Sequence, residues 1–275
     1  MMVFTCPGKL GDACLQLPVA RRWCLENETK CAVWADQGTC KSLIPLLESQ
    51  SWVSATRLLP GIQHYRCGGQ PWDFGFQVAD HLDNEIVHLG FRSFPQLQIT
   101  LQTLQDVPLN IDGSELATQE TFEIDGVIES NRLILHGTFQ APMSGTPGFW
   151  RFLGDRRKEL EGLFEEIVFV GSPNERKRAL EVYPEWTAFD DNGSFLDLAR
   201  LMKGSRAVIG AGSSNVALAS VLHVPCIRVH DDIGGLPWVI WSGLGDNQLN
   251  ETERDLREAW SAWRDAWILP TAMSV

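Results

Sequence analysis

The sequence has no excess of positive charge and no long hydrophobic run. It contains 23 Lys and Arg residues against 35 Asp and Glu residues, which gives a net charge of −12. An acidic surface repels nucleic acid and anionic lipid, so neither is expected as a partner. No stretch approaches the roughly 18 consecutive apolar residues of a transmembrane helix, and the run from Met1 to Cys6 is too short for a signal peptide. We therefore expect a cytoplasmic protein without a transmembrane segment.

The sequence also lacks the residue patterns of a metal site. Its cysteines form no CxxC pair, and no cluster of potential ligands has the short spacing that zinc requires. We interpret the cysteines as reduced core thiols and expect neither a metal ion nor a cofactor. Hydrophobic residues make up 44% of the chain and charged residues 21%, which is typical of a globular fold with a sizeable core. The cysteines are Cys6, Cys14, Cys24, Cys31, Cys40, Cys67 and Cys226.

Strand-like and helix-like segments alternate at the start of the chain, which is typical of a parallel sheet with helices on its faces. Short apolar runs predict buried strands, and apolar residues at helical spacing predict helices. The pattern is weaker from 60 to 125, where we expect a strand at 74–78, a helix at 96–105 and a polar linker at 110–126. The earlier strands are expected at 2–6, 31–35 and 53–58, and the earlier helices at 14–23 and 42–47.

The same alternation starts again near residue 128, so we expect two α/β domains with parallel sheets, at 1–127 and 128–250. The last part, 251–275, contains a tryptophan-rich helix that we expect to pack back on the body. Its Leu256, Trp260, Trp263 and Trp267 form one stripe, which favours core packing over stacking on a carbohydrate. The strands are expected at 132–137, 166–171, 207–210 and 225–229, and the helices at 149–164, 195–202, 213–222 and 251–267.

The sharpest local pattern follows the predicted strand Ala207–Gly210, where glycine and serine lead into a helix of small residues. Such a turn exposes the first backbone N–H groups of the helix, and the positive end of the helix dipole adds to their attraction for an anion. Ser213, Ser214 and Asn215 can cap this helix or contact a phosphate oxygen. The pattern alone leaves a phosphate site and an ordinary helix cap as alternatives.

A second glycine-rich turn, from Pro7 to Asp12, follows the first predicted strand. It matches neither GxxxxGK[ST] nor GxGxxG. Asp12 would face the crevice above the carboxyl edge of the sheet, where ligands bind in open α/β sheets. Taken by itself, however, an Asp at this position is better interpreted as a helix N-cap.

Together, the sequences around these two turns resemble the conserved patterns of glycosyltransferase family 9, which contains the ADP-heptose:lipopolysaccharide heptosyltransferases. This family has the GT-B architecture, with two Rossmann-like domains facing an interdomain cleft. Its pattern LGD-x-x-x-x-x-P is matched by Leu10–Pro18, and its pattern GNDSGPMHLAAALGVP resembles GAGSSNVALASVLHVP at Gly210–Pro225. Asp197–Met202 and Phe169–Glu175 resemble two further family segments, so the resemblance spans both halves of the chain.

The resemblance implies a GT-B-like α/β fold and an inverting, metal-independent transfer of a sugar from a nucleoside-diphosphate sugar to a glycan, lipid-linked glycan or other hydroxyl acceptor. The acceptor would bind the N-terminal domain and the nucleotide sugar the C-terminal one. Asp12 would act as general base, and backbone amides at Ser213–Asn215 with a nearby arginine would hold the leaving diphosphate. The expected binding residues are Lys9, Gly11, His136, Thr138, Arg151, Gly171, Ser172, Glu175, Gly212, Ser213, Ser214 and Asn215.

The chain departs from the family at several of these positions. Gly212 and Ala217 stand where the family has Asp and His, and no Lys or Arg shortly precedes Trp150. The candidates for the missing cation are Arg151, Arg156 and Arg157. Two alternatives therefore stay open beside the transferase: a non-catalytic nucleotide-sugar or glycan-binding protein on the same scaffold, and a nucleotide-sugar epimerase.

Overall fold

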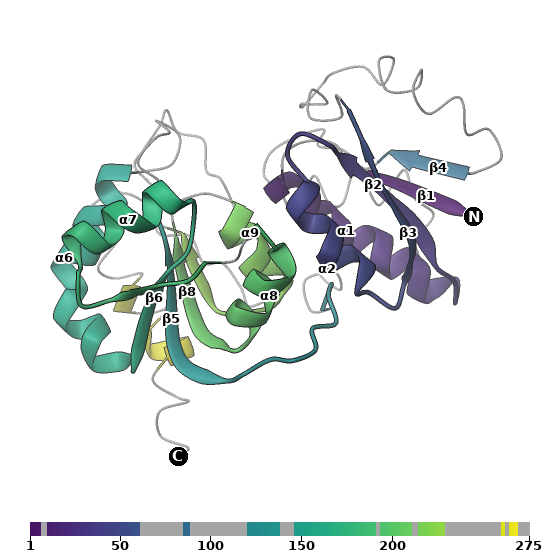
Figure 1. The fold of residues 1–275 in the computed structure, drawn as a ribbon. Helices are drawn as coiled ribbons and strands as arrows, with labels where there is room; N and C mark the ends of the chain where they lie inside the picture. Colours follow the sequence, from purple (N-terminus) through teal and green to yellow (C-terminus); the bar gives the residue numbers. More distant parts are fainter. Residues whose placement is uncertain are drawn as a thin grey trace. The chain divides into compact units, whose positions relative to one another are not determined.

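The computed structural model shows two compact units, each built on its own parallel sheet (Figure 1). Unit 1 comprises Met1–Glu123 with Ser194–Asp197, and unit 2 comprises Ile124–Gly193 with Leu198–Val275. The acceptor and nucleotide-sugar roles expected for the two domains stay predictions. The backbone alone is described for residues 12, 85–88, 146–148, 228 and 266–267. The residues that the structure describes are 1–6, 10–60, 85–88, 120–137, 146–190, 193–210, 214–228, 260–261 and 264–268.

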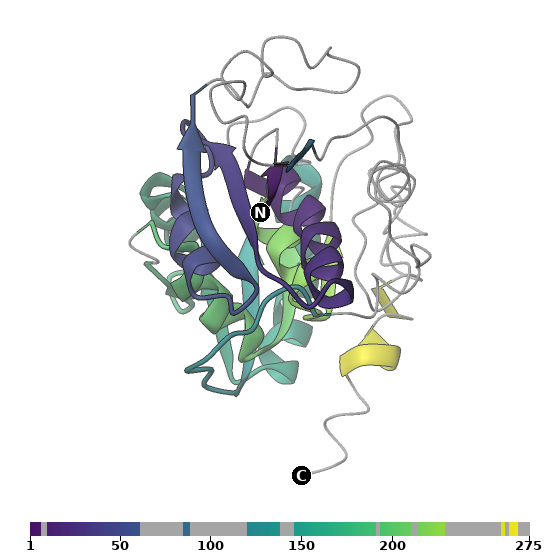
Figure 2. The same ribbon diagram turned by 90° about the vertical axis from the view of Figure 1, so that its right-hand side faces the viewer.

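Unit 1 contains a sheet of four parallel strands. Its elements are β1 (Met2–Cys6), α1 (Leu10–Glu26), β2 (Cys31–Asp36), η1 (Lys41–Leu43), α2 (Ile44–Glu48), β3 (Val53–Leu59) and β4 (Glu85–His88). The strand order is β3-β2-β1-β4, and β2 and β3 run side by side in Figure 2. Every residue of β1 and β2 is buried. This burial explains why both strands are continuous apolar runs, because central strands of a parallel sheet have no face exposed to water.

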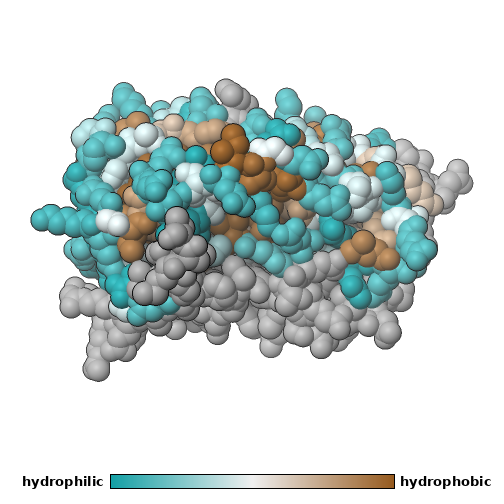
Figure 3. Space-filling model, turned by 90° about the horizontal axis from the view of Figure 1, so that it is seen from below, coloured by the Kyte–Doolittle hydropathy of each residue, from teal (hydrophilic) through white to brown (hydrophobic). Residues whose placement is uncertain are grey.

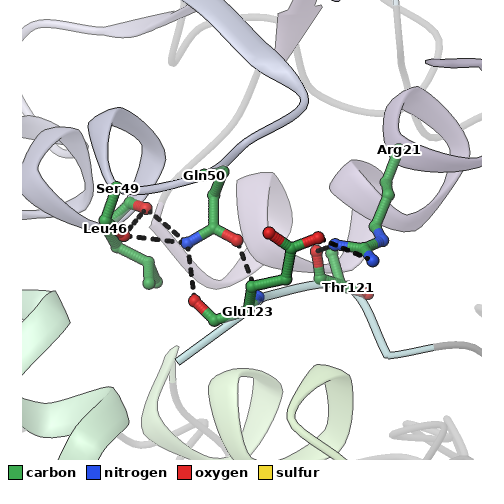
Figure 4. Close-up of polar contacts among 6 residues, drawn as sticks. All are labelled: Arg21, Leu46, Ser49, Gln50, Thr121 and Glu123. Atoms are coloured by element: carbon green, nitrogen blue, oxygen red, sulfur yellow. Dashed lines mark hydrogen bonds and ion pairs between the residues drawn. The ribbon is translucent and has the colours of Figure 1, made fainter. Parts of the chain in front are cut away.

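Within unit 1, the side chains of Arg21 and Gln50 hold the short stretch Thr121–Glu123 in place (Figure 4). The Oε1 atom of Gln50 accepts a bond of 2.7 Å from the Glu123 backbone N–H, and its Nε2 atom donates to the Glu123 carbonyl at 3.2 Å. Arg21 donates to the Thr121 carbonyl at 3.3 Å and pairs with the Glu123 carboxylate at 3.2 Å. Because Gln50 is buried, it satisfies backbone groups that would otherwise need a strand partner.

Unit 2 contains a sheet of five parallel strands in the order β7-β6-β5-β8-β9. The last four residues of β5 and of β8 are buried. These strands are apolar for the same reason as those of unit 1, because central strands of a parallel sheet have no face exposed to water. The elements are β5 (Ser130–His136), α6 (Thr146–Leu163), β6 (Glu166–Phe169), α7 (Pro173–Val182), β7 (Thr187–Ala188), α8 (Phe195–Lys203), β8 (Ser205–Gly210), α9 (Ser214–Val221) and β9 (Cys226–Arg228).

Part of the predicted C-terminal helix packs on the core of unit 2. Trp260 is 2% exposed, and its ring meets that of Phe152 edge-on at 5.5 Å. The Trp260 indole N–H donates to Glu159 at 3.1 Å, and Arg264 pairs with the same carboxylate. Arg264 begins a short π-helical turn, η5 (Arg264–Ile268). Leu256, Trp263 and the side chain of Trp267 lie outside the described residues.

The alternation seen in the sequence predicts most described elements, with four differences. The strand β4, the strand β7 and the helix α7 were not predicted. The helix α1 already begins at Leu10, so the predicted glycine-rich turn is wrong in its last three residues. The predicted strand at 74–78 and helix at 96–105 lie outside the described residues.

Hydrophilic residues cover most of the described surface seen in Figure 3, with a few apolar patches among them. Within the described segments, no helix combines the length and the apolar character that a membrane span requires. The large hydrophobic residues found exposed are Met1, Leu25, Ile128 and Val182.

Candidate functional site

The sheet of unit 2 has a topological switch point between β5 and β8. From β5 the chain adds β6 and then β7 on one side, and it later adds β8 on the other side of β5. In open α/β sheets, ligands bind at the carboxyl ends of the two strands where this order reverses. Here those ends are His136 of β5 and Gly210 of β8, which are partners in the strand register.

Gly210 allows the helix α9 to begin close to this switch point. A Cβ atom at this position would lie 2.6 Å from Cγ2 of Val216 in α9 and 3.3 Å from the His136 carbonyl oxygen. The first distance is shorter than real Cβ contacts and the second is tighter than most of them, so a larger residue would require Val216 or the start of α9 to shift. The first residues of α9 are Ser214, which is half-buried, and Asn215, which is 7% exposed. The N-terminus of α9 therefore lies beside the carboxyl end of β8.

A second glycine brings the start of α7 against His136. Gly171 follows β6 and has a φ angle of +139°, a conformation that glycine adopts most readily. A Cβ atom there would lie 3.0 Å from Oε2 of Glu175 and 3.3 Å from Cδ2 of His136. Because Gly171 has no side chain, the Glu175 carboxylate and the His136 ring both lie close to the position that its Cβ atom would occupy.

Glu175 is held in place by a capping box at the start of α7. Its Oε2 atom accepts bonds from the Ser172 backbone N–H at 2.9 Å and from the Ser172 hydroxyl at 2.7 Å. The Ser172 hydroxyl in turn accepts the Glu175 backbone N–H at 3.4 Å. Because these bonds satisfy groups that a helix start leaves unpaired, they order both the helix and the carboxylate.

Arg176, the next residue of α7, ties this turn to the end of β7. Its Nη1 atom donates to the Gly171 carbonyl at 3.1 Å and to the Phe189 carbonyl at 3.2 Å. Its Nη2 atom pairs with Asp190 at 3.0 Å. The guanidinium therefore has a structural role in the turn that presents Glu175.

Burial and charge act in opposite directions on His136. The side chain is 7% exposed, and loss of hydration lowers the pKa of its ring from the ordinary value of 6.5. The Glu175 carboxylate opposes this effect because it favours the imidazolium form, but the net shift of the pKa is downward. His136 is therefore neutral at pH 7 in the ligand-free protein.

We expect the free energy of unfolding to fall as the pH drops below about 6.5, by at most about 1.4 kcal/mol per unit from this residue. The unfolded chain then binds a proton that the folded protein binds only at lower pH, so stability is lost between the unfolded and the folded pKa of His136. Urea midpoints between about pH 5 and about pH 7 measure the effect. A His136→Gln variant with the same pH slope as the parent would contradict this assignment.

Unit 1 has a switch point of the same kind. Its strands β2 and β3 extend to one side of β1, and β4 lies on the other side, with Thr5 in register with His88. The helix α1 follows the carboxyl end of β1, so its first turn starts at this edge of the sheet. Asp12 is the third residue of α1. The interpretation of Asp12 as the N-cap is wrong, since the residue lies inside the first turn.

The structure brings together only some of the residues predicted from sequence. His136, Gly171, Ser172 and Glu175 meet around the carboxyl end of β5, and Ser214 and Asn215 begin α9. Gly11 lies in the first turn of α1. The predicted residues Lys9, Thr138, Gly212 and Ser213 lie outside the described part of the chain.

Of the three arginines considered for the missing cation, two have other partners. Arg156 lies over the ring of Phe152 at 4.4 Å. Arg157 pairs with Glu161 at 2.9 Å and with Glu185. Arg151 is exposed on α6 and stays a prediction. Among the described residues, no group of three or more His, Cys, Asp or Glu is placed to hold a metal ion.

The sequence patterns did not indicate that Arg176 supports this site or that His136 lies close to Glu175. The signal for the helix start was present, because Ser172-Pro173-Asn174-Glu175 has the spacing of a capping box with proline at the first helical position. No pattern in the sequence indicates that this helix start lies against His136. That contact depends on the parallel pairing of β5 with β6.

No family model matches the chain, and no curated protein matches it in sequence. Solved structures are nevertheless similar to it. An E. coli heptosyltransferase solved with ADP-2-deoxy-2-fluoro heptose matches with a TM-score of 0.58 and 12% identity, over 95% of this chain and 98% of that chain. E. coli ADP-heptose lps heptosyltransferase II matches with a TM-score of 0.55, at the same identity and coverage.

A family 9 glycosyltransferase from Veillonella parvula matches with a TM-score of 0.58 and 12% identity, over 95% of this chain and 88% of that chain. Together with the parallel sheets of both units, these likenesses show that the chain has the GT-B-like α/β fold of the family 9 heptosyltransferases. The fold class predicted from the sequence and the resemblance to this family are confirmed at the level of fold.

Proposed function

We propose that the chain is an inverting, metal-independent glycosyltransferase that moves a sugar from a nucleoside-diphosphate sugar to a hydroxyl group of a glycan or lipid-linked glycan. The likeness in fold to two heptosyltransferase structures, whose alignments cover 95% of the chain, carries the proposal. The cytoplasmic location expected from the sequence is part of it. Fold alone does not assign activity, so the residues at the two switch points supply the rest of the argument.

The acceptor chemistry is assigned to the start of α1. Asp12 lies in the first turn of that helix, directly after the carboxyl end of β1. A carboxylate there accepts the proton of the acceptor hydroxyl as the oxygen attacks the anomeric carbon. An unperturbed Asp has a pKa of about 3.9 and is a weak base, but the hydroxyl becomes more acidic as the new bond forms. The single displacement inverts the anomeric configuration.

The donor chemistry is assigned to the switch point of unit 2. The nucleoside diphosphate leaves with negative charge, and the unpaired N–H groups at the start of α9 are suited to bind it. Ser214 and Asn215 belong to this first turn. Arg151 remains the candidate arginine for this diphosphate, and Gly171, Ser172 and Glu175 at the start of α7 are proposed to belong to the same site.

A binding protein without catalytic activity is the second candidate function. It is favoured by Gly212 and by Ala217, which occupy positions where the family has Asp and His. Ala217 is 2% exposed within α9, so it has no side chain that reaches a ligand. Both candidates predict nucleotide binding, and only the transferase predicts release of a nucleoside diphosphate.

A panel of nucleoside diphosphates and nucleotide sugars tests the proposal by thermal shift. A ligand present at about 100 times its dissociation constant is expected to add roughly 2.7 kcal/mol of stability. Bound donors are then tested for nucleoside diphosphate release with hydroxyl acceptors. Release supports the transferase, and binding without release with any acceptor supports the binding protein. Failure of every nucleotide and nucleotide sugar to shift the melting temperature would rule out both.

A further inference from the structure

In the sequence, the segments that follow the strands of unit 2 contain few Lys and Arg residues. The chain leaves the carboxyl edge of the sheet after each strand, and the residues that follow each strand are where a bound phosphate would find a cation. The carboxylates of Glu175 and Asp190 lie on two of these connections. No Lys or Arg occurs in the sequence in residues 137–150, 170–175, 189–199, 211–227 or 229–253. Arg228 lies between the last two of these ranges, as the last residue of β9 and in register with Gly210.

The arginines that follow these stretches on α6 and α7 are mostly engaged elsewhere. Arg176 donates to two backbone carbonyls and pairs with Asp190. Arg157 pairs with Glu161 and Glu185. Arg151, exposed on α6, is the arginine that sequence reasoning assigned to the ligand. Among these arginines, Arg151 and the last residue of β9, Arg228, are therefore left as fixed cations for a diphosphate at the switch point.

Among the described residues at this switch point, His136 is a neutral group that can become a cation. From α7, the charged group that faces it is the Glu175 carboxylate beside Gly171. Gly210 of β8 is the register partner of His136, and Val216 of α9 lies against the same glycine; neither residue is titratable. A negative ligand placed beside this ring would stabilise its protonated form, because an opposite charge nearby favours the charged state.

We propose that His136 takes up a proton when an anionic nucleotide sugar binds at the switch point of unit 2, so that its imidazolium adds positive charge beside the ligand. The inference rests on the proposed donor site. In the free protein, burial keeps the ring neutral; in the complex, the ligand and Glu175 act on it together. Donor binding and proton uptake are then thermodynamically linked.

The linkage predicts tighter donor binding at lower pH. A nucleotide sugar that binds in the panel is the right probe, because its diphosphate keeps the same charge throughout the titration. We expect its dissociation constant to be about tenfold higher at pH 8 than at pH 6, which corresponds to one proton bound over about one pKa unit. Calorimetry in buffers of different ionisation enthalpy should show uptake of about 0.5–1 proton near neutral pH.

Two variants assign the proton to His136. His136→Gln should bind the probe with little dependence on pH. Glu175→Gln keeps a side chain that suits the capping box but removes the charge that favours the imidazolium, so the fall in affinity should move to lower pH. His223→Asn is the matched control, since this residue lies beyond the other end of α9 with a φ angle of +56°, which asparagine tolerates.

The outcomes separate this inference from the proposed function. If the probe binds with equal affinity at pH 6 and pH 8 and no proton is taken up, the inference is wrong and the donor site stands. If proton uptake persists in His136→Gln, another group titrates and the assignment is wrong. If no nucleotide sugar binds at either pH, the donor site itself is wrong. If His136→Gln does not fold, proton uptake by the parent protein and the pH dependence of probe affinity in Glu175→Gln test the inference instead.

Discussion

Replacing Asp12 with asparagine is expected to lower turnover by about 10²–10⁴-fold, because the variant keeps the shape of the side chain and loses the base that accepts the acceptor proton. The residue lies in the first turn of α1, where a negative charge also interacts favourably with the helix dipole. Loss of that charge costs about 0.3–1 kcal/mol. The variant should therefore stay folded. Nucleoside diphosphate release with a donor from the panel gives the turnover, and melting temperature gives the stability.

The matched control for Asp12→Asn is Glu26→Gln in the same helix. Glu26 pairs with Arg22 at the other end of α1, at 3.1 Å, and its loss should leave turnover unchanged. Near-normal turnover in Asp12→Asn would show that another group accepts the proton. A collapse of the melting temperature together with the activity would show that Asp12 is structural.

Replacing Ser214 with glutamate is expected to weaken nucleotide-sugar binding by about 100-fold or more, since juxtaposed like charges cost several kcal/mol. Ser214 is the first residue of α9, so a carboxylate there would lie beside the N–H groups assigned to the diphosphate. The same carboxylate suits the positive end of the helix dipole, and the fold should be preserved. Titration calorimetry with the donor measures the loss.

Ser214→Gln is the control, because glutamine has nearly the size of glutamate without the charge. It should reduce affinity much less than Ser214→Glu does. Equal losses in the two variants would indicate a steric effect on α9 rather than an anion site. Unchanged affinity in Ser214→Glu would place the diphosphate elsewhere in the protein.

Most of the framework could be predicted from the sequence because buried parallel strands have a simple local signature. All residues of β1 and β2 are buried, and both are apolar runs of the expected length. The strands β4 and β7 could not be predicted in the same way. They contain four and two residues, and both residues of β7 are exposed, so pairing with a neighbouring strand and not composition makes them strands.

The helix α7 was missed for a different reason. Its sequence, PNERKRALEV, has one residue that is buried, Ala179, so the apolar periodicity of a surface helix is weak. The capping box that begins it was the better signal, because it depends on side-chain hydrogen bonds rather than on hydrophobic spacing. A capping box can be recognised from four neighbouring residues even where the sequence gives no indication of which side chains are buried.

The sequence by itself determined the alternating α/β framework and the two helices that follow β1 and β8, in whose first turns Asp12 and Ser214 lie, because apolar runs, glycines and capping residues act on their neighbours in the chain. Only the tertiary structure decided that β5 and β8 form a switch point and that the ring of His136 meets Glu175 beside Gly171. Strand order and the packing of a helix start against another strand are set by contacts between residues far apart in sequence. Local patterns carry no information on which strands become neighbours, so the environment of His136, and with it the direction of its pKa shift, emerges only from the folded chain.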